Sequence, residues 1–247
     1  MSKLPHAPLV EVIFDMRWDS SLEKDLEKFQ FTLGTMFSSL KDDFPIIKKL
    51  QPAQLPIGAL LNAPSHRFLP NIETSYPVYQ IGPGVLSVNT VDKYYEWDDF
   101  SKIACKVANT FINLYKFDND KKLTLSLKYL DFYDVNFNEI NIYKYLMANF
   151  HVDIKSPNID ETENPTVLNF ATAFKTNFGM MNLKINTGII NDIKFKKTGL
   201  IIDNTINLSI RAGDWDKIIP NWLNESHNYL SDYFKKMTDG KKYESFK

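Results

Sequence analysis

Two segments of the chain alternate between apolar and polar residues, and each is followed by a stretch with helical periodicity. In the first segment, residues 9–18, the apolar side consists of Val10, Val12, Phe14, Met16 and Trp18. A side-chain period of two is typical of a β-strand with one buried face. Residues 123–135 repeat the pattern, and apolar residues recur at helical spacing over 22–40 and 139–150. The fold therefore has to pack two half-buried strands and their helices around an apolar core.

The remaining segments continue the same order in both halves of the chain. Six of the twelve prolines lie between residues 45 and 77, and they exclude a long helix or a central strand there because proline lacks an amide donor. A hairpin is predicted at 76–89 around Gly82-Pro83-Gly84, and a helix follows it at 98–115. The second half is predicted to contain a polar loop at 155–166, strands at 167–176, 180–190 and 200–210, and a helix that begins near Pro220.

These elements predict an α+β fold of one domain, residues 1–247, with similar halves at about 1–118 and 119–247. Each half has the order strand, helix, antiparallel strands, closing helix. Two such units side by side would form one curved, largely antiparallel sheet with helices on one face. This architecture is analogous to the saddle of the TATA-binding protein, and the analogy carries no functional meaning.

Composition predicts a cytoplasmic protein and disfavours nucleic acid as a partner. The first residues lack the uninterrupted apolar stretch of a signal peptide, and no window has the roughly 20 apolar residues of a membrane span. Cys105 has no second cysteine with which to form a disulfide. The net charge is −1, and the arginines, which most sequence-reading proteins use for base and phosphate contacts, are only Arg17, Arg67 and Arg211.

The familiar catalytic and metal-binding signatures are missing from the sequence. It has no phosphate-binding glycine loop, HExxH, CxxC pair or GxSxG, and its four histidines fall in separate predicted elements without ligand spacing. We therefore predict no metal, no cofactor and no catalytic residue. Residues 153–155 and 192–194 each match the acid-x-lysine end of a metal-dependent nuclease motif, in a chain rich in Asp, Lys and Ile.

Two groups of side chains give binding signals. Glu11, Asp15 and Arg17 place charges of both signs on the polar side of the first strand, where they would hold a polar ligand or a partner's side chain, or form cross-strand salt links. An aromatic cluster would stack on bases, form a protein contact or pack in the core between sheet and helix. Its members are Tyr76, Tyr79, Tyr94, Tyr95 and Trp97.

Short runs spread over nearly the whole chain carry a family resemblance. They are Ala7-Pro8-Leu9-Val10-Glu11, then Tyr76-Pro77-Val78-Tyr79-Gln80 with Gly82 and Asn89, then Tyr94, Trp97 and Phe100, then Leu127-Lys128-Tyr129-Leu130-Asp131, and finally His227, Phe234 and Thr238. In order and spacing they resemble a family of uncharacterised prokaryotic proteins that is scattered sporadically among bacteria and archaea. The family pattern has arginine and asparagine at the positions of Lys128 and Asp131.

The resemblance implies no known activity, substrate or cofactor, and the sporadic distribution is typical of mobile or defence-associated genes. It supplies the candidate binding residues Glu11, Tyr79, Gln80, Asn89, Tyr94, Trp97, Lys128, Asp131 and His227, to which the charge pattern of the first strand adds Arg17. We predict a non-catalytic binding or protein-interaction module whose partner is another protein encoded nearby. A metal-dependent nuclease or hydrolase and a nucleic-acid-binding protein are the alternatives.

Overall fold

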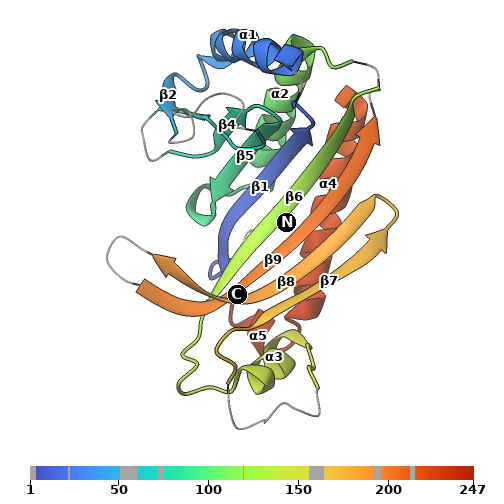
Figure 1. Ribbon diagram of the computed structural model, residues 1–247. Coiled ribbons are helices and arrows are strands. Elements are labelled where there is room, and N and C mark those ends of the chain that lie inside the picture. The colour runs from blue at the N-terminus through green and yellow to red at the C-terminus, as the bar shows by residue number, and fades with distance from the viewer. Residues whose placement is uncertain are drawn as a thin grey trace.

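The computed structural model describes residues 4–21, 23–50, 61–71, 75–118, 120–155, 164–191, 196–211 and 215–247 (Figure 1). The strands in these ranges are β1 (Leu9–Trp18), β2 (Ile46–Lys49), β3 (His66–Leu69), β4 (Val78–Gly82), β5 (Val85–Val91), β6 (Lys122–Asp134), β7 (Asn169–Thr176), β8 (Gly179–Asn191) and β9 (Lys196–Arg211). The helices are α1 (Glu23–Leu40), α2 (Trp97–Tyr115), α3 (Ile142–Phe150), α4 (Trp215–Met237) and the short α5 (Lys241–Glu244).

All nine of these strands belong to one antiparallel sheet in the order β2-β3-β4-β5-β1-β6-β9-β8-β7. The two strands that the alternation singled out, β1 and β6, pair with each other at the centre, with Phe14 opposite Leu127. Helices α2 and α4 pack along one face of the sheet, and within the described ranges the other face carries no helix (Figure 1). The predicted α+β fold with an antiparallel sheet and helices on one face is confirmed.

The two halves of the chain place their elements in the same order around the central pair. Going outward from the centre, the first half has β1, β5, β4 and β3, and the second has β6, β9, β8 and β7. In both halves a helix follows the central strand and a longer helix closes the unit. Strand β2 is an addition at the outer edge of the first half, among the residues that the structure describes.

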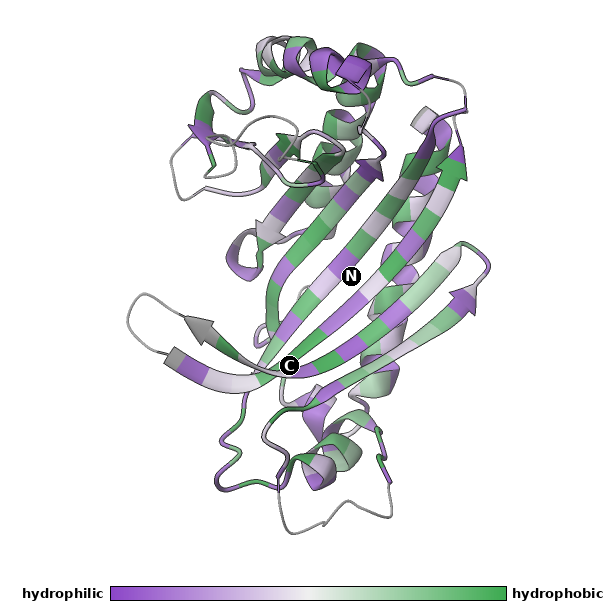
Figure 2. Ribbon diagram, viewed as in Figure 1, coloured by the Kyte–Doolittle hydropathy of each residue, from purple (hydrophilic) through white to green (hydrophobic). Residues whose placement is uncertain are grey.

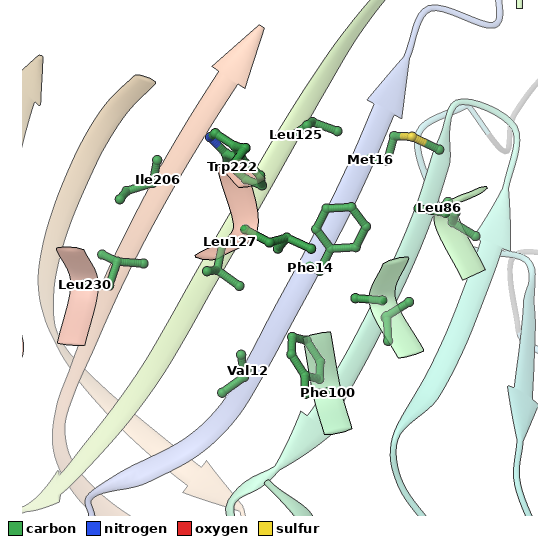
Figure 3. Close-up of a cluster of buried hydrophobic side chains, with 14 of the residues drawn as sticks. Val12, Phe14, Met16, Leu86, Phe100, Leu125, Leu127, Ile206, Trp222 and Leu230 are labelled. Atoms are coloured by element: carbon green, nitrogen blue, oxygen red, sulfur yellow. The ribbon is translucent and has the colours of Figure 1, made fainter. Parts of the chain in front are cut away.

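The core lies between the sheet and the helices. Hydropathy alternates along β1, β6 and β9 (Figure 2), and the apolar side of each strand faces the helices. Val12, Phe14 and Met16 of β1 are fully buried, and they meet Phe100 of α2 in the same cluster as Trp222 of α4 (Figure 3). Each such side chain stabilises the fold by about 1.5–3 kcal/mol when it is fully buried, so the sheet and the long helices depend on each other.

Several predicted boundaries were wrong. The last helix begins at Trp215, and Pro220 lies within it, where its missing amide removes one hydrogen bond near the start of the helix. Helix α3 begins at Ile142, later than predicted, because the Asn141 side chain caps it by accepting from Lys144 N. Most of the predicted polar loop at 155–166 lies outside the described residues.

Candidate functional site

On β6 and β9, the face that packs against the helices carries an aspartate and an asparagine among apolar and aromatic residues. On β6, Asp131 continues the series of leucines and tyrosines that face the helices, and on β9, Asn204 lies between Ile202 and Ile206. Tyr129 pairs with Asn204 and Asp131 pairs with Ile202. Asp131 and Asn204 are therefore diagonal neighbours, a relation in which Cα atoms are roughly 7–8 Å apart. The register of β6 and β9 brings a carboxyl and an amide together under the helices.

A cavity of about 610 Å³ lies over these two residues. Its walls come from the segment before β1, the residues that lead into α2, the middle of α4 and helix α5. The large side chains that line it include Leu9, Tyr95, Trp97, Leu230, Phe234 and Tyr243. A concave site of this size, largely apolar with a few polar groups, is typical of small-molecule sites in proteins.

The polar groups of the floor are buried without partners. Asp131 is 4% exposed, and its carboxyl has no hydrogen-bond partner among the described residues. Burial raises the pKa of this carboxyl to about 7, because desolvation disfavours the charged form. Oδ1 of Asn204 is likewise buried without a partner in the described part of the chain. Buried polar groups in folded proteins are nearly always hydrogen-bonded, so this pair identifies the floor as a candidate site.

An aromatic group beside Asp131 joins the sheet to α2 and α4. Tyr129 Oη lies 2.6 Å from His227 Nδ1, and Tyr95 Oη lies 2.9 Å from Tyr129 Oη. The Trp97 ring stacks on the His227 ring with centroids 3.9 Å apart and planes 9° from parallel. Burial, with smaller contributions from nearby positive charges, lowers the pKa of His227 to about 4. The imidazole is therefore neutral at pH 7 and forms part of a rigid wall.

The wall formed by the N-terminal segment depends on a β-bulge at the start of β1. Leu9 pairs with Asp131, whereas Glu11 pairs with Leu130, so Val10 is an extra residue on β1. Leu9 consequently lines the cavity, and Val10 is 36% exposed. The alternation predicted Val10 on the buried side, and that prediction was wrong because a bulge has no signature in a period of two.

Backbone hydrogen bonds hold this N-terminal wall in place. Pro8 O accepts from Phe132 N at 2.9 Å, which attaches the segment to β6. His6 N donates to Phe246 O at 3.0 Å, which attaches it to the residues after α5. The two ends of the described chain therefore close the same side of the cavity.

The opposite, helix-free face of the sheet carries a connected set of polar side chains. Asn89 Nδ2 donates to Glu11 Oε1, and Gln80 Nε2 donates to Asn89 Oδ1 at 3.1 Å. Lys128 pairs with Asp203 at 3.2 Å. These groups come from four neighbouring strands, β4, β5, β1 and β6, together with β9, and they satisfy one another.

The structure thus divides the ten predicted binding residues among four places. Trp97, Asp131 and His227 line the cavity. Glu11, Arg17, Gln80, Asn89 and Lys128 lie on the helix-free face. The remaining two, Tyr79 and Tyr94, belong to neither group.

The aromatic cluster that the sequence suggested does not form a single platform. Tyr79 is fully buried in the core and stacks on Phe68 with centroids 4.3 Å apart. Tyr76 and Tyr94 stack on each other at 5.9 Å, and Tyr94 is exposed at 39%. Tyr95 and Trp97 are separate from both pairs and line the cavity.

Sequence reasoning did not single out Asn204 or Tyr129 as site residues, and it named Tyr95 only as a member of the aromatic cluster. A usable signal was present for Asn204, because it is the one strongly polar residue in the series Leu200, Ile202, Asn204, Ile206, Leu208, Ile210. Asp131 interrupts the matching series on β6 in the same way. A polar residue on the apolar side of a strand is thus the pattern that locates this cavity.

One of the two acid-x-lysine segments behind the nuclease alternative lies within the described residues. Asp153 and Lys155 form an ion pair at 2.9 Å at the surface, and Asp192 lies outside the described residues. In the described ranges, no group of three or more His, Cys, Asp or Glu side chains is arranged to hold a metal ion. No helix there is long and apolar enough to cross a membrane.

Comparison with known proteins adds no functional information to this geometry. The family resemblance stays a prediction, because the chain matches no protein-family model, no curated protein and no solved structure.

Proposed function

We propose that the protein binds a small organic molecule in the cavity formed by β6, β9, α2 and α4. The observation that carries the proposal is the carboxyl of Asp131, buried at the floor of a cavity of about 610 Å³ beside Asn204 and without a hydrogen-bond partner among the described residues. Leaving a buried polar group unsatisfied costs about 1–3 kcal/mol. A ligand that bonds to this carboxyl would recover that free energy when it binds.

The surrounding geometry supports binding more than catalysis. Nδ1 of His227 is within hydrogen-bond distance of Tyr129, and the imidazole is covered by Trp97 on one face. Both contacts hold the imidazole ring in one orientation, so it can form a fixed wall of a binding cavity. The proposal keeps the sequence-based hypothesis of a non-catalytic binding module. It differs in naming a small molecule as the ligand.

The other functional hypotheses stay predictions. A protein partner encoded nearby, a nuclease activity and binding to nucleic acid each rest on the sequence alone. Glu11, Arg17 and Lys128 lie on the helix-free face. Substitutions of these residues should weaken binding of a partner to that face and leave binding of a ligand in the cavity unchanged.

The experiment that tests the proposal compares a filled cavity with an open one. Ser231 of α4 lines the cavity, so the larger side chain in Ser231→Phe should occupy part of it. Ser38→Phe, on an exposed position of α1, adds the same bulk outside the cavity and is the matched control.

Native mass spectrometry of the purified protein and a thermal-shift screen of small organic compounds provide the readout. We expect bound or stabilising compounds with the wild-type protein and with Ser38→Phe, and their loss with Ser231→Phe. Compounds that bind all three proteins equally, or none of them, would contradict a ligand site in the cavity.

A further inference from the structure

The carboxyl at the floor of the cavity sets the hydrogen-bonding character of a ligand. An ionised carboxyl such as that of Asp131 only accepts hydrogen bonds. A ligand group that bonds to it must donate. An ammonium group has three N–H donors and no acceptor, so it matches this floor more fully than a hydroxyl or a carboxylate does.

The charged groups that line the cavity besides Asp131 have both signs. Asp92 and Glu96, before α2, line it together with two lysines, Lys235 of α4 and Lys247. Lys235 is paired with Asp232 at 3.2 Å, and Lys247 is paired with Glu244 at 2.6 Å. Neither of these ion pairs includes Asp131.

Three titratable groups near Asp131 are neutral at pH 7. His227 faces it from α4, and burial lowers the pKa of this imidazole to about 4. Tyr129 and Tyr133 lie on β6 on either side of Asp131, and burial raises the pKa of both phenols. An ionised Asp131 therefore has no counter-charge in contact with it in the described chain.

The walls suit the rest of such a ligand. Tyr95, Tyr129, Trp97 and Phe234 line the cavity, and aromatic faces attract cations with about 0.5–2 kcal/mol depending on desolvation. Apolar residues complete the lining, among them Leu9 and Leu230. The cavity thus combines a buried carboxyl with aromatic and aliphatic surface.

We propose that the ligand is an organic amine that binds as a cation, with its ammonium group on Asp131 and its aromatic or aliphatic body against the α2 and α4 walls. This inference rests on the proposed binding function, because it names the class of molecule that occupies the same cavity. A protonated Asp131 would instead donate to an acceptor on a neutral ligand, and the dependence of affinity on pH separates the two cases.

The test uses three probes of similar size and different charge: phenethylamine, 2-phenylethanol and 3-phenylpropionate. Their dissociation constants are measured by ligand-observed NMR or calorimetry with the wild-type protein at pH 8. We expect the amine to bind at least about tenfold more tightly than the alcohol, a difference of about 1.4 kcal/mol, and the carboxylate to bind most weakly. Equal affinity for the amine and the alcohol would overturn the amine proposal and leave a ligand site in the cavity.

Two variants and the pH dependence complete the test. Asp131→Asn keeps the shape of the floor and removes its charge, so it should lower amine affinity about tenfold and leave the alcohol unchanged. Asp99→Asn, exposed on α2, removes one carboxylate outside the cavity and should change neither. Amine affinity should rise from pH 5.5 to 8 in the wild-type protein only, as Asp131 ionises.

The outcomes separate the two proposals. Affinity that falls with pH, or an amine preference that survives in Asp131→Asn, would overturn recognition by Asp131. If none of the three probes binds and the compound screen described above is also negative, the proposed function itself fails. If the screen yields only neutral or anionic ligands that Ser231→Phe excludes, binding in the cavity stands and the amine class is wrong.

Discussion

Trp97, at the first residue of α2, stacks on His227 in α4 with ring centroids 3.9 Å apart. The contact joins the closing helices of the two halves at the side of the cavity, beside the hydrogen bond between His227 and Tyr129. Stability and the shape of the cavity therefore depend on the same residues.

Trp97→Ala should lower the free energy of unfolding by about 2–4 kcal/mol, because it removes a large partly buried ring and the stack on His227. Urea denaturation followed by circular dichroism measures the change. Tyr94→Ala is the control, since Tyr94 is 39% exposed and stacks on Tyr76 at 5.9 Å; its effect should be below about 1 kcal/mol. Equal changes in the free energy of unfolding for the two variants would contradict a stabilising contribution from the stack of Trp97 on His227.

His227 should make the protein less stable in acid. The pKa of its imidazole is lowered to about 4 in the fold, so its contribution is present above the unfolded value of about 6.5 and is lost as pH falls toward 4. The loss amounts to at most about 3 kcal/mol. His227→Phe keeps an aromatic ring against Trp97 and cannot titrate. Between pH 7.5 and 4.5, wild-type stability should fall relative to this variant; parallel curves would contradict a buried neutral histidine.

Asp131 should make the protein less stable as the pH rises, which is the opposite of the effect of His227. The pKa of its carboxyl is raised to about 7, so the stability that the protonated form contributes is present below about pH 4 and is lost as pH rises through 7. Asp131→Asn should match the wild-type protein near pH 4 and exceed it at pH 8 by about 2–4 kcal/mol in the absence of ligand. Urea midpoints at the two pH values check this. A variant that is less stable at pH 8 would show that the carboxylate has a stabilising partner.

Gly199 of β9 should tolerate no side chain. A Cβ atom there would lie 2.1 Å from Tyr133 O and 2.7 Å from the Phe132 ring, so Gly199→Ala should destabilise the protein by about 2 kcal/mol or more. Gly34→Ala is the control, because nothing lies within 4 Å of that Cβ and alanine favours a helix by about 1 kcal/mol. Thermal melts of both variants should shift in opposite directions.

The central pairing of β1 with β6 predicts that neither half folds alone. Nine residues of β1, Leu9 and those from Glu11 to Trp18, have partners on β6, and cutting the chain near residue 120 would expose the apolar face and the edge of both strands. A fragment of residues 1–120 should show no cooperative thermal transition by circular dichroism. A cooperative melt of that fragment would indicate two independent domains.

The sequence predicted the regular elements well because their signals are local. The alternation in β1 and β6, the turn at Gly82-Pro83-Gly84 and the apolar stripe of α2 each depend on residues a few positions apart, and each element is present. The errors occur where a boundary depends on context. Pro220 predicts the start of a helix that begins at Trp215 in the structure, and the bulge at Val10 moves one residue to the other face.

The sequence alone determined that the chain forms an α+β fold with two half-buried strands, because a period of two and a period of 3.6 specify which side of each element is apolar. It also contained the two polar interruptions, Asp131 and Asn204, although only Asp131 was singled out. The tertiary structure decided that these interruptions meet, since the register of β6 with β9 makes them diagonal neighbours. It also decided that Trp97 and His227, 130 residues apart, close the cavity above them, because packing between helices is set by the whole core and by no local pattern.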